Sequence, residues 1–536
     1  MKTYLHTLLL FFITLSANAQ SPTQKDFPIK GFHLDLRIQI MKMPALKALA
    51  RDLHQQGINT LLMEWEASYP FQEEPQIANR YTYSRAEIND FIRCCHKLNI
   101  DVIPLQQSFG HVEYILRNYK FAGLREDEHD LSQLCPAQKE LNKQLFTRLY
   151  QDLAATHSSP YIHIGCDETH LLGHCPRCQK LAAEEGLSKL YFDHVKMLCD
   201  IVISLGKRPV LWADIALKHL EYLQLLPKQT ILIDWNYGWD LDRFGDHSKL
   251  AGSGYEIWGS PALRSEPDNY YLTRWQHHLG NISQFIPQCR QLGYKGVIMT
   301  SWSTSGVYNP LFNADDELAE LYPVRHVYPL AGFNLLISAY TRALHNEEKF
   351  EPEHFITTWC QNRYGLNEAA ARRFQKALFN APYKVINGKV ISPSGINLAA
   401  LLDSAREAAQ TMHTLNPGKN QMEFGHYRLM ADIRVYYLTY INIEAAANAA
   451  NSIREYQNYA GRLRALMATE PLLDQTFRRL NGGTLYPAAI QEENAIRIYR
   501  THQLYQRLTG LKIGTIQTSK ITSYEQHQKD PATRTT

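Results

Sequence analysis

The sequence predicts an α/β fold class, a (β/α)8 TIM barrel followed by an all-α C-terminal domain. In residues 30–325, short strand-like runs alternate with amphipathic helical stretches, a pattern typical of parallel strands with helical crossovers. The runs number eight, the number of strands that closes such a barrel, and the span fits its usual size. An open doubly wound sheet is the alternative, but no Gly-rich phosphate loop follows the first run.

The eight expected strands are short apolar runs between the helical stretches. They are 31–37 (GFHLDLR), 58–64 (INTLLME), 101–105 (DVIPL), 161–165 (YIHIG), 209–213 (PVLWA), 230–235 (TILIDW), 253–258 (SGYEIW) and 296–302 (GVIMTSW).

The C-terminal part of the chain has a different sequence pattern, with long helical periods and no alternation with strand-like runs. In residues 345–515, long helical periods such as LAALLDSAREAAQTMHTL predict the helical domain. Within it, YKVINGKVIS predicts a small hairpin on an Asn-Gly turn. Residues 517–536 are polar, so we expect a mobile tail.

The first residues predict a cleaved signal peptide. Residues 1–19 hold one early lysine, an apolar run from Leu8 to Leu15, and Ala17 and Ala19 before the expected cut. This run is far shorter than the ~20 residues that span a bilayer, so we expect no membrane span. The sequence therefore predicts an exported protein, periplasmic or extracellular.

The charge balance argues against nucleic acid as a partner. The chain has 56 Lys and Arg against 53 Asp and Glu, a net charge of +3, and no basic cluster dense enough to follow a phosphate backbone. We expect a neutral or small ligand. The sequence leaves the oligomeric state open.

The expected barrel mouth is rich in aromatic and charged residues. In this fold the chemistry lies where strands end and the following loops begin. The residues expected there are Arg37, Glu64, Trp65, Glu66, His111, Asp167, Glu168, Trp212, Asp214, Trp235, Tyr237, Trp258 and Trp302. Five of the eight tryptophans of the chain are among them, whereas core tryptophans would scatter over both domains. Because aromatic rings stack on the C–H face of sugars, the pattern predicts a carbohydrate site.

Two adjacent carboxylates, Asp167 and Glu168, follow the fourth expected strand. Asp167 alone could cap a helix and Glu168 alone could be a surface residue. Adjacent residues at a strand end leave in different directions, so one can reach a leaving-group oxygen while the other contacts another part of the same sugar. They are too close in sequence to act as nucleophile and acid on opposite faces of a ring, so a nucleophile must come from elsewhere.

The run His163-Ile164-Gly165-Cys166-Asp167-Glu168 resembles the His-x-Gly-x-Asp-Glu signature of the family 20 glycoside hydrolases, the β-N-acetylhexosaminidases. The segments GFHLDLR, INTLLMEWEASYPF and SFGHVEYILRN, with the Trp-bearing later strands, extend the resemblance over essentially the whole barrel. Cys166 stands directly before Asp-Glu, where a second glycine is replaced by cysteine in the hexosaminidase D-like branch. In this position the chain resembles that branch.

This resemblance implies an exo-acting, retaining hydrolase that removes terminal β-linked N-acetylhexosamine, either GlcNAc or GalNAc, from a glycan. The 2-acetamido oxygen of the substrate is then the nucleophile. Asp167 would hold the acetamido N–H and stabilise the charged intermediate. Glu168 would protonate the glycosidic oxygen and then deprotonate water. This chemistry uses no cofactor and no catalytic metal.

The resemblance also implies roles for the other charged residues of the mouth. Arg37 would bind hydroxyls of the non-reducing sugar. His111 would lie near the acid/base residue, backed by Glu66, with Glu64 as the alternative. Asp214, at the end of the fifth strand, counts among the substrate-binding residues.

The aromatic residues would form the acetamido pocket, with Trp212, Trp235 and Trp302 as its walls. Tyr237 would donate to the acetamido carbonyl. The segment TSWSTSG lacks the acidic residue that many relatives have after this tryptophan, and Glu320 would serve instead.

The C-x-x-C of Cys175 and Cys178 lies just beyond the acidic pair. These two residues with His170 and His174 contain the ligand types of a zinc site, although both histidines belong to one short loop. In an oxidising compartment a disulfide is the alternative, with Cys135 as a third participant. Either form would brace the active site rather than constitute it.

A different class of function is a catalytically weak or inactive carbohydrate-binding protein on the same barrel. The intact Asp167-Glu168 pair favours the enzyme, because a binding protein needs no proton donor. Hydrolysis of an aryl N-acetyl-β-hexosaminide separates the two.

Overall fold

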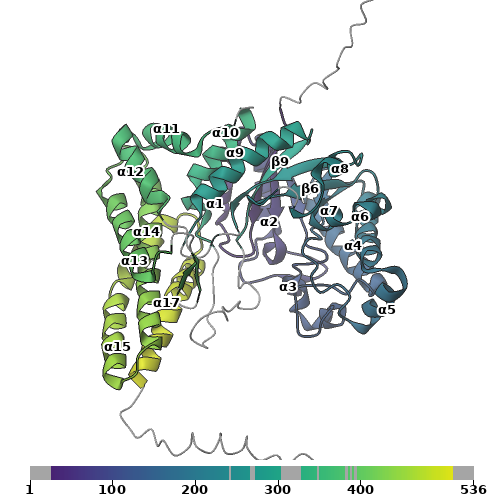
Figure 1. Cartoon of the computed structure of the whole chain (residues 1–536). Helices are drawn as coiled ribbons and strands as arrows, with labels where there is room; N and C mark the ends of the chain where they lie inside the picture. The colour runs from purple at the N-terminus through teal and green to yellow at the C-terminus, as the bar shows by residue number, and fades with distance from the viewer. Residues whose placement is uncertain are drawn as a thin grey trace, which may run out of the picture.

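The computed structural model describes residues 26–240, 243–265, 268, 272–303, 327–346, 349–380, 384–386, 389–391 and 395–510. The expected signal peptide 1–19, the expected tail 517–536 and Glu320 lie outside the described residues. The described part forms a parallel β-barrel surrounded by helices, followed by a helical region that lies beside it (Figure 1). The predicted fold class is confirmed.

Eight parallel strands follow one another around the barrel in chain order. They are β1 (Ile29–Asp35), β2 (Thr60–Glu64), β3 (Asp101–Leu105), β4 (Tyr161–His163), β5 (Arg208–Trp212), β6 (Ile231–Trp235), β7 (Glu256–Ser260) and β9 (Gly296–Ser301). The barrel closes because β1 pairs with both β2 and β9. A short extra strand, β8 (Ala262–Arg264), pairs with β9. All eight expected strands are present, and the largest shift is at β7, which begins at Glu256 rather than at residue 253.

Glycines allow the strands to approach at the closing seam. A Cβ on Gly31 would lie 2.7 Å from Cγ1 of Ile298, and one on Gly296 would lie 2.7 Å from Cβ of Ile29. Real side chains do not tolerate such contacts, so a larger residue at either position would force β1 and β9 apart.

The barrel interior is a packed apolar core with aromatic residues among its members. The core cluster of buried residues consists of Leu62, Ile103, Leu105, Val210, Trp212, Ile231, Ile233, Trp235, Tyr237, Trp258, Ala262, Ile298 and Trp302. Along each strand, residues that face this core alternate with residues that face the surrounding helices, because successive side chains of a strand point to opposite sides.

The prediction that Trp258 lies at the barrel mouth is wrong. Trp258 pairs with Gly296, the first residue of β9, and its ring meets that of Tyr161, the first residue of β4, edge-on at 5.4 Å. Trp258 therefore fills the opposite, N-terminal end of the barrel. The strand extends to Ser260, so its true C-terminal end lies beyond the tryptophan.

Trp65 also lies outside the mouth. Its indole nitrogen donates a hydrogen bond to Nε2 of His157 at 3.0 Å, and its ring packs edge-on against Phe91 of the surrounding helices. Glu64, one residue earlier, contacts the buried side chain of His33 in the barrel. Because successive residues of a strand face opposite sides, Trp65 faces the outer layer.

Helices lie between the strands of the barrel in the chain. They are α1 (Met43–Gln55), α2 (Arg85–Lys97), α3 (Glu113–Leu116), α4 (Lys139–Thr156), α5 (Pro176–Glu185), α6 (Leu187–Ser204), α7 (Asp214–Lys218), α8 (His247–Ala251) and α9 (Trp275–Gln291). Short 3-10 turns lie between them: η1 (Glu66–Ser68), η2 (Pro75–Ile77), η3 (Tyr119–Leu124) and η4 (Leu220–Leu225).

Helix α2 shows how the local sequence specifies these helices. Ser84 caps the helix by accepting from the backbone N–H of Glu87, and the Glu87 carboxylate accepts from the backbone N–H of Ser84. Ile88, Phe91, Ile92 and Cys95 are its buried residues, one face of a 3.6-residue period.

The C-terminal region consists of helices and one small hairpin. After η6 (Leu330–Gly332), the elements are α10 (Asn334–His345), α11 (Pro352–Tyr364), α12 (Glu368–Leu378), β10 (Lys384–Ile386), β11 (Lys389–Ile391), α13 (Leu398–Thr414), α14 (Gln421–Asn448), α15 (Ile453–Met467), α16 (Glu470–Asn481) and α17 (Pro487–Gly510). The antiparallel pairing of β10 with β11 confirms the expected hairpin. None of the described helices is both long enough and apolar enough to cross a membrane.

Hydrogen bonds between described residues anchor this region to the barrel, among them bonds at the closing seam and after β1. The hydroxyl of Tyr340 on α10 donates to the carbonyls of Gly31 and Val297 at the closing seam. After β1, the backbone N–H of Lys42 donates to the carbonyl of Thr484 at 2.7 Å, between α16 and α17. The helical region therefore contacts the loop that follows the first strand.

Candidate active site

Unusual backbone conformations gather at the C-terminal ends of the strands. Among the described residues, seven non-glycine residues have positive φ angles. Five of them follow barrel strands: Gln39 (53°), Glu66 (43°), His111 (55°), Cys166 (74°) and Glu168 (48°). Each such residue costs on the order of 1–3 kcal/mol, and such strain concentrates at functional sites. The backbone thus identifies the same end of the barrel that the sequence indicates.

The turn after β4 orients the acidic pair. Gly165 has φ +71°, and a Cβ there would lie 2.0 Å from Oε1 of Gln107, so only glycine fits. The hydroxyl of Tyr191 donates to the carbonyl of Cys166 at 2.7 Å and holds the next residue. As a result the side chain of Asp167 is 8% exposed, whereas that of Glu168 is 43% exposed.

His111 lies against both carboxylates. Its Nε2 is 3.3 Å from Oε2 of Glu168 and 3.5 Å from Oδ2 of Asp167. The preceding residue, Gly110, makes this possible, because a Cβ there would lie 2.4 Å from the carbonyl oxygen of Asp167. The loop after β3 is therefore packed directly on the turn after β4.

The charges of His111 and Glu168 stabilise each other. Burial of His111 opposes its charged form, but the carboxylates of Asp167 and Glu168 outweigh this effect and raise its pKa well above the usual value. The hydrogen bond from His111 lowers the pKa of Glu168, and this outweighs the opposing effect of burial. The arrangement favours an imidazolium and an ionised carboxylate.

Asp214, the first residue of α7, is buried close to the same pair. Its Oδ2 accepts from the backbone N–H of Glu168 at 3.3 Å. Burial, and then the charge of Asp167, raise the pKa of Asp214 to about 7. No described residue bonds to Oδ1 of Asp214 or of Asp167. Buried polar atoms are normally bonded, so these oxygens are candidates for ligand contacts.

The predicted aromatic wall is continuous. The ring of Trp212 lies 5.7 Å from that of Trp302, and the indole nitrogen of Trp302 donates to the hydroxyl of Tyr237 at 2.8 Å. The ring of Tyr237 lies 5.0 Å from that of Trp235. The described residues provide no acceptor for the buried indole nitrogens of Trp212 and Trp235. The wall thus combines apolar ring surface with two free donors.

Two histidines that the sequence reasoning did not assign support this wall. The ring of His33 packs 4.5 Å from that of Trp302, and the ring of His163 packs 4.4 Å from that of Trp212. Burial lowers the pKa of His163 well below its usual value, so this ring is neutral. In β1, His33 shares a strand face with Gly31 and Asp35, because residues two positions apart point to the same side. This period of two is the signal in the sequence that could have identified His33 as a site residue.

Glu64 belongs to the support of the site. Its Oε2 accepts from Nε2 of His33 at 2.9 Å, because Nδ1 of His33 accepts from the backbone N–H of Ser301. Its Oε1 accepts from Nε2 of Gln107 at 3.1 Å. Burial would raise the pKa of Glu64, but the charge of Arg37 and these bonds lower it well below its usual range.

Arg37 is held by carboxylates. Its Nε and Nη2 donate to Asp35 at 3.1 and 2.9 Å, and its Nε lies 4.0 Å from Glu64 and 3.9 Å from Glu66. The guanidinium also lies over the ring of Trp302, 5.5 Å from its centroid. The structure thus brings Glu66 to Arg37. Asp35, the residue that forms the bidentate pair, was missed, although it is two positions from Arg37 in GFHLDLR.

A cavity of about 350 Å³ adjoins Arg37, and the helical region forms part of it. Its charged and aromatic lining comprises Arg37, Arg80, Tyr81, Arg117, Glu492 and Glu493. The two glutamates belong to α17. The helical region therefore contributes to the mouth of the barrel, a role that its sequence did not reveal.

The zinc ligand set that the sequence offers as an alternative to a disulfide is not assembled among the described residues. His170 and His174 are exposed and point to no shared site with the cysteines. Cys175 and Cys178 instead meet Cys135, together with Glu126.

Comparisons with known proteins identify the family of the chain. Residues 34–316 match the catalytic domain of glycosyl hydrolase family 20. The chain is similar to hexosaminidase D of Bos taurus, 27% identical over 310 residues, which are 54% of this chain and 87% of that protein. It is also similar to hexosaminidase D of Homo sapiens, with 28% identity over 303 residues. The matched residues are 53% of this chain and 62% of that protein. The chain thus spans less than two thirds of the human relative.

Among solved structures, the chain is similar to the exo β-N-acetylglucosaminidase of Vibrio harveyi in complex with N-acetylglucosamine. The two share 16% sequence identity, the match covers 61% of this chain and 55% of that chain, and the TM-score is 0.45.

We predict that Asp214→Asn stabilises the fold more at about pH 8 than at about pH 5. The carboxyl group ionises near pH 3.8 in the unfolded chain but near 7 in the folded one. The folded state therefore holds a proton that the unfolded state has released, so the free energy of unfolding of the wild type falls as pH rises between these values. Asparagine removes this dependence.

The measurement is thermal unfolding of both proteins at the two pH values. Asp403→Asn, at an exposed site on α13, is the matched control. An identical pH response of the wild type and Asp214→Asn would contradict the raised pKa.

Proposed function

Because the chain belongs to glycosyl hydrolase family 20, we propose that it is an exo-acting, retaining β-N-acetylhexosaminidase. It removes terminal β-linked GlcNAc or GalNAc from a glycan. The observation that carries the proposal is the divergence of Asp167 and Glu168: one carboxylate is buried, and the other is exposed at the mouth against His111.

The substrate supplies the nucleophile in this proposal. The oxygen of its 2-acetamido group attacks the anomeric carbon, and a positive charge develops on the ring that forms. Asp167 accepts the acetamido N–H through its unbonded Oδ1 and stabilises this charge. Its burial favours the role, because a preorganised carboxylate acts more strongly where water is excluded.

Glu168 acts as acid and then as base. Its exposed side chain can reach the glycosidic oxygen, protonate it, and later take a proton from the incoming water, so the configuration is retained. A bound glycan removes water from around the carboxyl group. Desolvation raises the pKa of a carboxyl group and so favours the protonated acid that the first step needs.

The aromatic wall holds the acetamido group. Trp212, Trp235 and Trp302 supply ring surface for its methyl group and for the sugar face. The hydroxyl oxygen of Tyr237 accepts from Trp302, which leaves its hydrogen for the acetamido carbonyl. Arg37, fixed by Asp35, binds hydroxyls of the terminal sugar.

We also propose export of the chain to a periplasmic or extracellular location, on the basis of residues 1–19. Fractionation of the producing cells, with N-terminal sequencing of the mature protein, tests this proposal. An intact N-terminus on cytoplasmic protein would contradict it.

A carbohydrate-binding protein without turnover is the second candidate. The observation in its favour is the lowered pKa of Glu168 beside His111, which opposes the protonated form of a general acid. Hydrolysis of an aryl N-acetyl-β-hexosaminide distinguishes the two, because a binding protein leaves it intact. Comparison of the gluco and galacto substrates then gives the sugar preference.

We predict that Asp167→Asn lowers kcat about a hundredfold or more on an aryl N-acetyl-β-hexosaminide, since it removes one preorganised charge. A thiazoline analogue of the intermediate should inhibit the wild type and bind this variant much more weakly. Asp403→Asn, at an exposed position, should match the wild type. Rapid hydrolysis of a glucoside without the acetamido group, or a trapped glycosyl ester on a carboxylate of the chain, would overturn substrate assistance.

We predict that Glu168→Gln abolishes most turnover of substrates with poor leaving groups. Aryl substrates with good leaving groups should suffer less in the first step, because they need little protonation. Glu184→Gln, at an exposed position on α5, is the control. Equally small losses on both substrate types would remove Glu168 from the acid/base role.

We predict that His111→Asn moves the basic limb of the kcat/KM profile to higher pH. The variant loses the hydrogen bond that lowers the pKa of Glu168, so this pKa rises. The first step needs protonated Glu168, and a higher pKa preserves that form to higher pH. The profile is measured on a substrate with a poor leaving group, with exposed His129→Asn as control. An unmoved or acid-shifted limb contradicts the coupling.

A further inference from the structure

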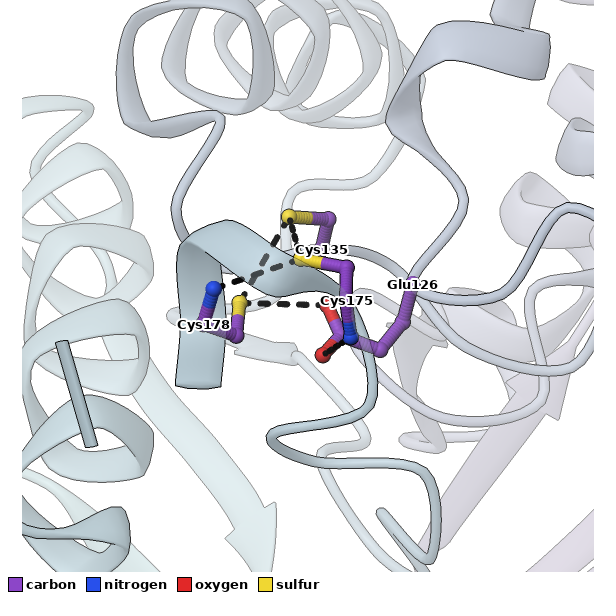
Figure 2. Close-up of side chains that lie close together, drawn as sticks. All are labelled: Glu126, Cys135, Cys175 and Cys178. Atoms are coloured by element: carbon purple, nitrogen blue, oxygen red, sulfur yellow. Dashed lines mark hydrogen bonds between the residues drawn. The ribbon is translucent and has the colours of Figure 1, made fainter. Parts of the chain in front are cut away.

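Three cysteine thiols and one carboxylate meet beside the loop that follows the acidic pair (Figure 2). Glu126 and Cys135 come from the segment between η3 and α4, Cys175 caps α5, and Cys178 lies in its first turn. The Sγ atom of Cys135 is 3.4 Å from that of Cys175 and 3.6 Å from that of Cys178. Oε2 of Glu126 is 3.1 Å from Sγ of Cys178, and all four ligand atoms lie within 4.8 Å of one another.

These distances suit a tetrahedral metal ion. With zinc–sulfur bonds of about 2.3 Å, the sulfurs of a tetrahedral site lie about 3.8 Å apart, close to the separations here. A disulfide needs sulfurs about 2.0 Å apart and joins only two of them. It would leave the third thiol beside the Glu126 carboxylate, which is buried and forms no ion pair with another described residue.

The surroundings already hold the ligands in place. Oε1 of Glu126 accepts from the backbone N–H groups of Gly173 and Cys175 at 3.1 and 3.0 Å, so its Oε2 is left for the cluster. The backbone N–H of Cys178 donates to Sγ of Cys175 at 3.3 Å and so holds this sulfur in place. Hydrogen bonds of this kind orient the ligands of metal sites.

We propose that Glu126, Cys135, Cys175 and Cys178 bind one structural zinc ion. Four protein ligands close its coordination sphere, so it offers no open position for a substrate or a water nucleophile. The site does not depend on the proposed hydrolase activity, because its evidence is the ligand geometry alone.

The ion would join the two loops that carry the candidate catalytic groups. The loop after β3 holds His111 and continues to Cys135, and the backbone N–H of Leu134 donates to the carbonyl of Phe109. The loop after β4 holds the acidic pair and continues to Cys175. Oε1 of Gln133 accepts from the backbone N–H of Leu171 at 2.8 Å, a direct link between the loops. Zinc would reinforce this link and the placement of His111 at Glu168.

The first test is the metal content of the full-length chain, purified without added metal. We expect about one zinc ion per chain by elemental analysis. Alkylation in denaturant and chelator, without a reductant, should label all nine cysteines. Glu126→Gln and Cys178→Ser should lose most of the zinc. Cys360→Ser, which changes a buried cysteine of α11 outside the cluster, should retain it.

The second test needs no variant and so stands even if the substitutions prevent folding. A thiol-reactive mercurial added to the wild type should release the zinc, detected with a chromogenic chelator. Cobalt(II) exchanged into the site should give the intense visible absorption of tetrahedral thiolate coordination. Removal of zinc should lower the melting temperature, and zinc added back should restore it.

Two outcomes would overturn the proposal: a wild type without bound metal, or a disulfide between any two of Cys135, Cys175 and Cys178. Hydrolysis assays on the same samples separate this proposal from the function proposed above. Full zinc content with no turnover would refute the activity and leave the metal site standing. Turnover by a chain without bound metal would refute the metal site and leave the proposed activity standing.

Discussion

The site depends on the turn that follows β4. Gly165 must be a glycine because Gln107 occupies the place of its side chain, and Tyr191 holds the carbonyl of Cys166. The left-handed backbone that results sends Asp167 inward and Glu168 outward. A relaxed strand end would place the two carboxylates differently relative to the aromatic wall. The strain in this turn therefore lowers the stability of the fold, while the turn fixes the positions of the two candidate catalytic carboxylates.

The mouth carries more carboxylates than cations, and most of these carboxylates are buried. The carboxylates are Asp35, Glu64 and Glu66 around Arg37, and Asp167, Glu168 and Asp214 around His111. Such an excess destabilises the empty fold, as the raised pKa of Asp214 indicates. It also favours any positive charge that develops on a bound sugar, which is what the proposed reaction requires. Stability and the proposed activity are thus opposed at this end of the barrel.

Two errors in the sequence interpretation concern the face of a strand on which a side chain lies, or its level along the barrel axis. Trp65 follows Glu64 directly, yet the two lie on opposite sides of the strand. Trp258 belongs to the interior but to its opposite end, because β7 continues to Ser260. A shift of one residue changes the face, and a shift of a few residues changes the level in the barrel.

The sequence by itself determined the number and order of the strands, the helical region and the adjacent acids at the end of the fourth strand. These features depend on neighbours in the chain, so local patterns reveal them. Only the tertiary structure decided which distant groups meet these residues. It brings His33 beneath Trp302, Asp214 to Glu168, and Glu126 to cysteines 49 and 52 residues away. Such partners are set by barrel closure and by the packing of one loop on another, which no local period records.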